Sequence, residues 1–348
     1  MRAAVLHAPG PPEAFKIEDI PVPAIHGNQV LVQVAACGVS SKDVVERNGT
    51  YRRDMSFPIV IGMEIAGTVV ACGPDVVDLS IGERVCTKAF SSCGQCRHCR
   101  NGHETTCARR APVRGGYGEF AAIAADACVR IPAELSFEVA CTLGPGAGVA
   151  LNAVRDTAGV KLGEIVLISG ASGGVGLPAL QLAKAAGART IAVTRGDAKT
   201  AGLLEDGADE VIVAPAGHNF AKQVRALTDG EGVDVVIDTV GSSVFHACFD
   251  ALAMHGRYAL VGQLTGEEVS INLARIFFKR AHLLGVGSVS RAQLEDAVAL
   301  AARGVLRPRL ARTLPLDEIA AAHRSVESGS LSGRIIVKPG RLTEKGGT

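Results

Sequence analysis

Four closely spaced cysteines give the sequence its clearest chemical signal. Cys93, Cys96, Cys99 and Cys107 lie in one short segment, whereas the other six of the ten cysteines are scattered along the chain. Four thiolates suit a tetrahedral Zn²⁺ ion, and such a closed site is structural because it leaves no position for a substrate. An iron–sulfur cluster also uses four cysteines, but the glycine-containing loop without a proline after the last cysteine disfavours it. We predict one structural zinc in a lobe spanning residues 91–110.

A glycine-rich turn is the second chemical signal. A buried strand ending at Ser169 is predicted to run into a glycine-rich segment, and a helical pattern follows. Glycines let the backbone approach a pyrophosphate, while the helix N-terminus offers free N–H groups and the positive end of its dipole. A glycine-rich turn alone is a weak signal, but its place between a strand and a helix strengthens it. The predicted dinucleotide-binding residues are Ser172, Gly173, Gly174, Val175 and Gly176.

The residue that ends the next strand indicates which dinucleotide binds. An Asp or Glu there would bind the ribose 2′-hydroxyl of NAD, whereas a cation accommodates the 2′-phosphate of NADP. The sequence has Thr194 and Arg195 at this point and Lys199 one turn later. A solvated basic helix start would give the same pattern, and Asp197 weakens the local positive field. We predict that Thr194, Arg195 and Lys199 bind NADPH.

The pattern of predicted secondary structure that must position these residues changes along the chain. Before about residue 148, short β segments such as 29–36, 65–72 and 119–123 are separated by Gly and Pro. After it, short apolar runs alternate with helical patterns, which is typical of a parallel sheet covered on both faces. The runs are 165–169, 190–194, 211–213, 233–238, 258–261 and 283–286. Helices at 291–303 and 316–329 lead to a last strand, 333–338, which we expect to return to the first domain.

Composition excludes several classes of protein. The chain has 348 residues, enough for about two domains, and 47% of them are hydrophobic. Its 36 Lys and Arg balance 35 Asp and Glu, so no whole-chain field attracts nucleic acid or an anionic membrane. The first residues lack the pattern of a secretory signal, and no apolar run is long enough to span a membrane. We therefore expect a cytoplasmic protein with no nucleic-acid or membrane partner.

Together these features resemble the medium-chain dehydrogenase/reductase superfamily. The motifs that carry the resemblance are Gly62-Met63-Glu64-Ile65-Ala66-Gly67, Gly82-Glu83-Arg84-Val85, Gly115-Gly116-Tyr117-Gly118-Glu119-Phe120 and Asp238-Thr239-Val240-Gly241. The resemblance implies an α/β fold with a GroES-like, β-rich catalytic domain (1–147), a Rossmann doubly wound parallel-sheet domain (148–287) and a return to the catalytic domain (288–348). It also implies cofactor contacts from Val240, Val261, Gly262, Gly287 and Ser288, and assembly as a homodimer or homotetramer.

The sequence departs from the zinc dehydrogenases of this superfamily at their catalytic metal. The three ligand positions are occupied by Ser40, Met63 and Pro145, and of that motif only Glu64 remains. Serine and thioether are poor Zn²⁺ ligands, and proline offers none. Cys37 and Cys141 are near these positions in sequence but would need a register shift. We predict no catalytic zinc.

The activity expected without that zinc is reduction of a substrate that is already electrophilic. Alcohol oxidation needs a Lewis acid to stabilise the alkoxide, whereas hydride from NADPH can add to the β-carbon of an enone, enal or enoyl thioester, or to a quinone. The zinc-free quinone oxidoreductase and enone reductase group has an Arg-x-Gly-x-Tyr segment, matched here by Arg47 to Tyr51. The alternatives are a zinc alcohol dehydrogenase with a relocated ligand set and a non-enzymatic NADPH-binding protein.

Individual roles at the expected active site follow from side-chain chemistry. Tyr51 could donate a hydrogen bond or proton to the substrate, and Ser40 could bind its carbonyl oxygen, although either could simply pack. We expect Asp43 to cap the helix that follows and Glu64 to form an internal ion pair. Lys42, with neighbouring arginines, could attract an acidic substrate or remain solvated.

Overall fold

The computed structural model describes residues 1–50, 55–215, 217–329 and 331–340, and these form two compact units. Unit 1 comprises residues 1–145, 289–302 and 309–348, and unit 2 comprises residues 146–288 and 303–308. Residues 303–308 thus belong to unit 2, whereas the sequence predicted that residues 288–348 return to the catalytic domain. Among the described residues, no helix is long and apolar enough to cross a membrane.

Unit 1 is built on a seven-stranded sheet and a separate hairpin. The hairpin pairs β1 (Arg2–Leu6) with β2 (Phe15–Asp19). The sheet has the order β14-β15-β3-β4-β5-β7, with β6 paired to β3. Its strands are β3 (Gln29–Val39), β4 (Glu64–Cys72), β5 (Arg84–Thr87), β6 (Phe120–Ala124), β7 (Cys128–Arg130), β14 (Leu310–Pro315) and β15 (Arg334–Lys338). Because β15 pairs antiparallel with β3, the prediction that the last strand returns to the first domain is confirmed.

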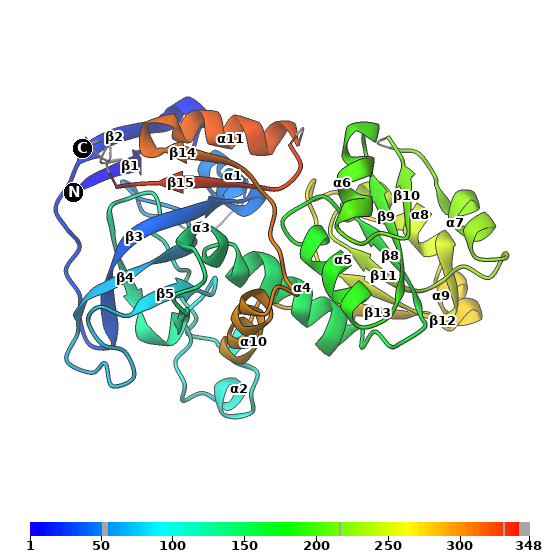
Figure 1. The fold of residues 1–348 in the computed structure, drawn as a ribbon, viewed down its shortest axis with the longest axis horizontal. Coiled ribbons are helices and arrows are strands. Elements are labelled where there is room, and N and C mark those ends of the chain that lie inside the picture. The colour runs from blue at the N-terminus through cyan, green and yellow to red at the C-terminus, as the bar shows by residue number, and fades with distance from the viewer. Residues whose placement is uncertain (51–54, 216, 330, 341–348) are drawn as a thin grey trace. The chain divides into compact units, whose positions relative to one another are not determined.

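The helices of unit 1 are short, and all but α2, which lies in a projecting lobe, pack near this sheet (Figure 1). They are α1 (Ser41–Asn48), α2 (Arg97–Arg100), α3 (Phe137–Ala140), α10 (Arg291–Ala302) and α11 (Ile319–Ser328). The helix α11 contacts α1 and β15. A buried network joins α1 to α11: the Arg47 guanidinium contacts His323 Nδ1 at 3.2 Å, and His323 Nε2 contacts the Tyr117 hydroxyl at 3.2 Å. Burial and the neighbouring Arg47 lower the pKa of His323 to about 3, so its ring is neutral.

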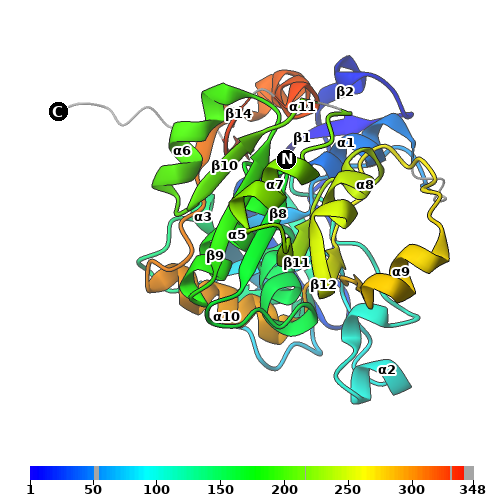
Figure 2. The ribbon, with the colours of Figure 1, turned by 90° about the vertical axis from the view of Figure 1, so that its right-hand side faces the viewer.

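Unit 2 is a six-stranded parallel sheet in the order β10-β9-β8-β11-β12-β13. Figure 2 shows β9, β8, β11 and β12 side by side. The strands are β8 (Ile165–Ser169), β9 (Arg189–Thr194), β10 (Glu210–Val213), β11 (Val233–Asp238), β12 (Leu252–Leu260) and β13 (His282–Gly285). The central strands β8 and β11 are almost wholly buried, as expected of a parallel sheet covered on both faces.

Helices cover the sheet of unit 2 and complete a Rossmann-type fold. α5 (Gly176–Ala185) packs on β8 and β9, α6 (Thr200–Glu205) on β10, and both α8 (Ser242–Ala251) and α9 (Leu273–Lys279) on β12. The other helices are α4 (Val149–Leu151) and α7 (Ala221–Leu227). The predicted fold class, a parallel α/β sheet with a GroES-like β-rich domain, is confirmed.

Candidate functional site

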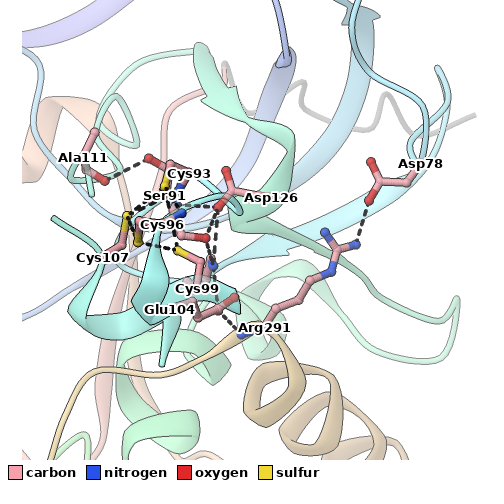
Figure 3. Close-up of polar contacts among 12 residues, drawn as sticks. Asp78, Ser91, Cys93, Cys96, Cys99, Glu104, Cys107, Ala111, Asp126 and Arg291 are labelled. Carbon is pink, nitrogen blue, oxygen red and sulfur yellow. Dashed lines mark hydrogen bonds and ion pairs between the residues drawn. The ribbon is translucent and has the colours of Figure 1, made fainter. Parts of the chain in front are cut away.

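The four predicted metal ligands converge in unit 1. Their sulfur atoms all lie within 4.8 Å of one another (Figure 3); Cys93 and Cys96 precede α2, Cys99 belongs to it, and Cys107 follows the next short helical turn. Individual Sγ–Sγ distances are 3.5 Å for Cys96–Cys99 and Cys93–Cys107, and 3.9 Å for Cys93–Cys99 and Cys96–Cys107. A Zn–S bond of about 2.3 Å places the sulfurs of a tetrahedral site about 3.8 Å apart. The cluster therefore fits a single tetrahedral ion, and it is too tight for a cluster of several irons.

Charged residues attach this cysteine lobe to the rest of unit 1 (Figure 3). The buried Lys88 ammonium lies 2.8 Å from Glu104 and 3.5 Å from Asp126. Glu104 also accepts a hydrogen bond from the backbone N–H of Arg291 at 2.6 Å, and the Ser92 backbone N–H donates to Asp126 at 2.6 Å. Because Arg291 begins α10, ordering the lobe also orders the start of that helix.

Ser40, a predicted substrate-binding residue, is the N-cap of α1. Its hydroxyl donates to Asp43 Oδ2 at 2.6 Å, and its backbone N–H donates to the same oxygen at 2.8 Å. The Asp43 N–H points back to the Ser40 hydroxyl, which completes a capping box. The expectation that Asp43 anchors this helix is confirmed. Desolvation raises the pKa of the fully buried Asp43, and its hydrogen bonds with Ser40 oppose that shift.

A buried ion pair lies next to this cap. Glu64 pairs with Arg334 of β15, as expected of an internal ion pair, although the sequence did not identify the partner. Desolvation outweighs the arginine and raises the pKa of Glu64 to about 7. The nearby thiols of Cys37 and Cys141 point to the backbone carbonyls of Gly38 and Glu138. Burial raises the pKa of both thiols.

Met63 is buried beside the side chain of Lys42. The Lys42 ammonium lies 3.5 Å from the Met63 sulfur, 3.2 Å from the Glu46 carboxylate and 5.2 Å from the centre of the Phe90 ring. Its side chain is 23% exposed, so it lies along the protein surface instead of extending into solvent. Arg114 approaches the same Glu46 carboxylate at 3.5 Å. Tyr51, the predicted proton donor, lies outside the described residues.

In unit 2 the glycine-rich turn has the geometry that a phosphate-binding turn requires. Gly170 has a φ of +60°, which favours glycine. At Gly176, the first residue of α5, a Cβ would lie 2.2 Å from the carbonyl oxygen of Gly170. The predicted residues Ser172–Gly176 connect β8 to α5, whose N-terminus receives no side-chain capping bond. In this first turn the Leu177 N–H donates to the carbonyl of Gly173 at 3.1 Å and Pro178 has no N–H, so the N–H of Gly176 is the helix donor left for an anion.

The predicted 2′-phosphate residues are together at the end of β9. Thr194 is buried, and its hydroxyl has no partner. Arg195 is exposed, and Lys199 lies close enough to be affected by its charge. Desolvation and then the charge of Arg195 lower the pKa of Lys199. A lysine whose charge is destabilised by a neighbouring arginine is expected where an anion binds.

The carboxyl ends of β8, β11 and β12 are linked through Asp238. The carboxylate of Asp238 accepts hydrogen bonds from the hydroxyls of Ser169 at 2.6 Å and Tyr258 at 2.7 Å. It also accepts the N–H groups of Val240 and Gly241, each at 3.0 Å. Sequence reasoning quoted Asp238 as part of a motif but missed this role, because the hydroxyls come from distant strands.

The remaining predicted cofactor residues lie at the same edge of the sheet. The N–H groups of Val261 and Gly262 donate to the carbonyl of Asp238 at 2.9 and 3.3 Å. The carbonyls of Gly287 and Ser288 both accept from the Asn152 side chain at 3.2 Å. Asn152 was not predicted, because its segment was not recognised as helical. Unit 2 thus gathers the residues predicted for the nicotinamide at the carboxyl ends of its strands, where open sheets bind ligands.

Family models match both units. The alcohol dehydrogenase GroES-like domain matches residues 26–133, and the zinc-binding dehydrogenase domain matches residues 174–303. An acryloyl-coenzyme A reductase from Sulfurisphaera tokodaii is 30% identical over 97% of this chain and 100% of its own length. The chain belongs to the medium-chain dehydrogenase/reductase superfamily. As a member, it is an NAD(P)-dependent oxidoreductase, which removes the non-enzymatic alternative.

Other relatives in this superfamily have different names. An alcohol dehydrogenase from Geobacillus stearothermophilus is 32% identical over 97% of this chain and 99% of its own, and the human quinone oxidoreductase is 30% identical over 97% of both. Among solved structures, AibC has a TM-score of 0.92 and 39% identity, covering 98% of this chain and 96% of its own. Mycobacterial Rv1454c, complexed with NADPH, has a TM-score of 0.84 and 27% identity, covering 97% and 100%.

Proposed function

We propose that this protein is an NADPH-dependent reductase of an activated C=C bond, in an enone, enal or enoyl thioester, or of a quinone, and that it works without a catalytic zinc. The observation that carries this proposal is the chemistry at the former ligand positions. Ser40 is engaged in a helix cap, Met63 is buried as a thioether, and the nearby thiols of Cys37 and Cys141 point to backbone carbonyls. The names of the acryloyl-coenzyme A reductase and quinone oxidoreductase relatives support the same chemistry.

The residues divide the proposed work between them. When bound, NADPH supplies a hydride to the electron-poor carbon of the substrate. Arg195 and Lys199 bind the 2′-phosphate, with the Thr194 hydroxyl beside them, and the turn Ser172–Gly176 binds the pyrophosphate. Backbone groups at Val240, Val261, Gly262, Gly287 and Ser288 orient the nicotinamide. Ser40 hydrogen-bonds the substrate when its hydroxyl turns from Asp43, which its backbone N–H continues to hold, and Tyr51 is the proton donor.

We further propose that Cys93, Cys96, Cys99 and Cys107 hold one structural Zn²⁺. The backbone N–H groups of Gln95 and Cys96 lower the pKa of Cys93 to about 6, whereas desolvation raises that of Cys99 to about 12, so binding of the ion must itself displace the remaining thiol protons. With four thiolates around it, the ion has no open position and takes no part in turnover.

The similarity to an alcohol dehydrogenase supports one alternative function, that of an alcohol dehydrogenase whose catalytic zinc has relocated ligands. Among the residues that the structure describes, the cysteine lobe is the one group of three or more His, Cys, Asp or Glu side chains close enough to hold a metal. Glu64 is committed to Arg334 and Asp43 to the α1 cap. This distribution favours the reductase.

The experiment that decides between these activities combines metal analysis with turnover. The purified protein should contain about one zinc per chain and should oxidise NADPH with members of a panel of enones, enals, enoyl thioesters and quinones. Added Zn²⁺ should not create alcohol oxidation. Two zinc ions per chain together with alcohol oxidation would establish the dehydrogenase and end the reductase proposal.

Assembly and location are proposed on separate observations. The strand β13 is an edge of the unit 2 sheet, and the apolar side chains of Leu273, Phe277 and Phe278 in the neighbouring α9 are 70%, 61% and 68% exposed. We propose that this edge forms the contact of a homodimer or homotetramer, which light scattering would test, with Phe277→Glu expected to dissociate it. The ten free cysteines suit a reducing compartment, so we propose the cytoplasm.

A further inference from the structure

Lys42 occupies a position that helix stability does not explain. It is the second residue of α1, where the positive end of the helix dipole disfavours a cation. Its pairing with Glu46 four residues later has the lysine before the glutamate, which is the weaker order for such pairs. A residue that opposes both local preferences is more easily explained by what its charge binds.

The surroundings of Lys42 contain polar atoms without partners. Within the described part of the chain, seven buried side-chain N or O atoms lack a hydrogen-bond partner, and four of them belong to Asp43, Glu46, Arg114 and Arg334. Glu46 contacts both Lys42 and Arg114, and the charges of Asp43 and Arg334 act on Glu64 beside them. Unpartnered buried polar groups are costly and mark places where a ligand or water completes the network. Of the five such atoms in unit 1, four thus belong to residues of the linked ion pairs of Lys42 and Glu64, and the fifth belongs to Asp126 beside the cysteine lobe.

The charges around Lys42 favour an anionic oxygen as that ligand. Arg114 helps to neutralise Glu46, and the other two nearby carboxylates are held by their own partners, Asp43 by Ser40 and Glu64 by Arg334. The Lys42 ammonium is therefore not needed to balance them, and it lies 3.2 Å from Glu46 and 5.2 Å from the centre of the Phe90 ring. Met63, in contact with the ammonium, is neutral and only a weak hydrogen-bond acceptor. One donor direction of the ammonium is thus occupied by a weak acceptor that a stronger one can replace.

We propose that Lys42 binds the carbonyl oxygen of the substrate and stabilises the enolate that forms during reduction, supplying with protein charge what a metal would otherwise supply. The proposal rests on the reductase function and names a further residue for it. As hydride adds to the β-carbon, the C=C π electrons form the C=C bond of the enolate and the carbonyl π pair moves onto oxygen, where Lys42 donates an N–H. Protonation at the α-carbon returns that pair to the carbonyl. The alkene gains one hydride and one proton, and NADPH is oxidised to NADP⁺.

The competing explanation is that Lys42 only neutralises the buried Glu46. A double substitution separates the two roles. Lys42→Gln should lower kcat for an enoyl thioester by about 100- to 1000-fold, the range for loss of one donor to a developing oxyanion. If Lys42 acts on the substrate, Glu46→Gln in that background leaves the rate low. If it only balances Glu46, removing both charges restores the rate, and that result would overturn the proposal.

The matched control is Arg114→Gln, which removes the other cation facing Glu46. It should keep kcat within about threefold of the parent, as expected for a partly exposed ion pair. A loss as large as that of Lys42→Gln would assign the effect to Glu46 and refute the proposal. Lys42→Ala should also regain rate with added ethylammonium, which a purely structural loss would not. Thermal unfolding of each variant checks that it is folded. If the parent protein reduces none of the activated alkenes, the proposed reductase function is wrong. If the parent is active and Lys42→Gln is equally active, only the role proposed for Lys42 is wrong.

Discussion

Unit 1 contains the two regions in which a zinc dehydrogenase of this superfamily binds its structural and its catalytic zinc. The first region has its metal-ligand residues here, and the second does not. The cysteine lobe has four sulfurs within 4.8 Å of one another. The region around Ser40 and Met63 has a helix cap, a thioether and the buried pair of Glu64 and Arg334 instead. The lobe contains few buried apolar residues and depends on ligation for its order, whereas the second region is held together by the core around it. A metal site is expected to be retained where its ligand bonds supply folding free energy that a segment cannot obtain from a hydrophobic core.

The largest effect should come from breaking the lobe. Cys96→Ser should release the metal and lower the thermal midpoint by about 10 °C, because the lost thiolate bonds contribute several kcal/mol to folding. Cys72→Ser is the control, since Cys72 lies outside the cluster. Elemental analysis and calorimetry provide the measurement. If Cys96→Ser kept both its metal and its melting temperature, the contrast between the two regions would disappear.

A smaller effect is expected at the cation pair of unit 2, which, like the lobe, we expect to be completed by a ligand. Arg195→Ala and Lys199→Ala should each weaken NADPH binding by roughly tenfold or more and leave NADH binding nearly unchanged, because only NADPH carries the 2′-phosphate. Arg189→Ala is the control: this cation begins the same strand and pairs with Glu210. Fluorescence titration measures both cofactors. Equal losses for the two would contradict the assignment.

The buried pair of Glu64 and Arg334 predicts a pH dependence of stability of its own. The pKa of Glu64 is raised from 4.5 to about 7, so its contribution to stability is present at low pH and is lost as the pH rises through about 7. Between about pH 5 and about pH 8, the free energy of unfolding should fall by roughly 1–3 kcal/mol more in the parent than in Glu64→Gln. Urea unfolding at both pH values measures this difference.

Glu83→Gln serves as the control for that curve. The hydrogen bond from Arg130 lowers the pKa of Glu83, so its contribution is lost only as the pH falls. Its removal should change the acid side of the curve and leave the slope near pH 7 in place. Parallel curves for the parent and Glu64→Gln would mean that the carboxylate is not desolvated as the structure indicates.

The smallest effect concerns the cap at Ser40. Ser40→Ala should lower the free energy of unfolding by about 1 kcal/mol, and Ser40→Gly by only a few tenths. Because both variants lack the hydroxyl proposed to contact substrate, both should lose a similar fraction of kcat. A rate that followed stability, with Gly close to the parent and Ala below it, would restrict Ser40 to capping.

Much of unit 2 could be predicted because its strands carry their signal locally. The strand Ile165–Ser169 was predicted with the bounds observed for β8, since a run of buried apolar residues ended by glycine is distinctive. The strand β12 begins at Leu252, earlier than the predicted 258. Its first half contains exposed Met254 and His255, the latter with a φ of 60°, and a register shift against β11 falls here. Pattern alone does not reveal such an irregular start.

Other elements were missed for identifiable physical reasons. The helix α9 was not predicted, because Leu273, Phe277 and Phe278 are exposed and Ile276 packs against the core, so its apolar residues do not share one face. The strand β14 is an edge strand that ends at Pro315 and has mixed burial. At the candidate site, the ligand spacing and the glycine turn are local features and were found. The partners of Glu64 and Asp238, Arg334 and Tyr258, lie on other strands, and one sequence does not show those pairings.

The Asp238 network has a consequence for redesign of the cofactor preference. One carboxylate fixes the loop that follows β11 by binding hydroxyls from β8 and β12. The residues proposed to discriminate the 2′-phosphate belong to β9 and the turn after it, and none of them contacts Asp238 through a hydrogen bond described here. Selection for a different coenzyme can therefore act on the β9 end while the support for the nicotinamide loop stays unchanged. The two properties are physically separable, so one could evolve without loss of the other.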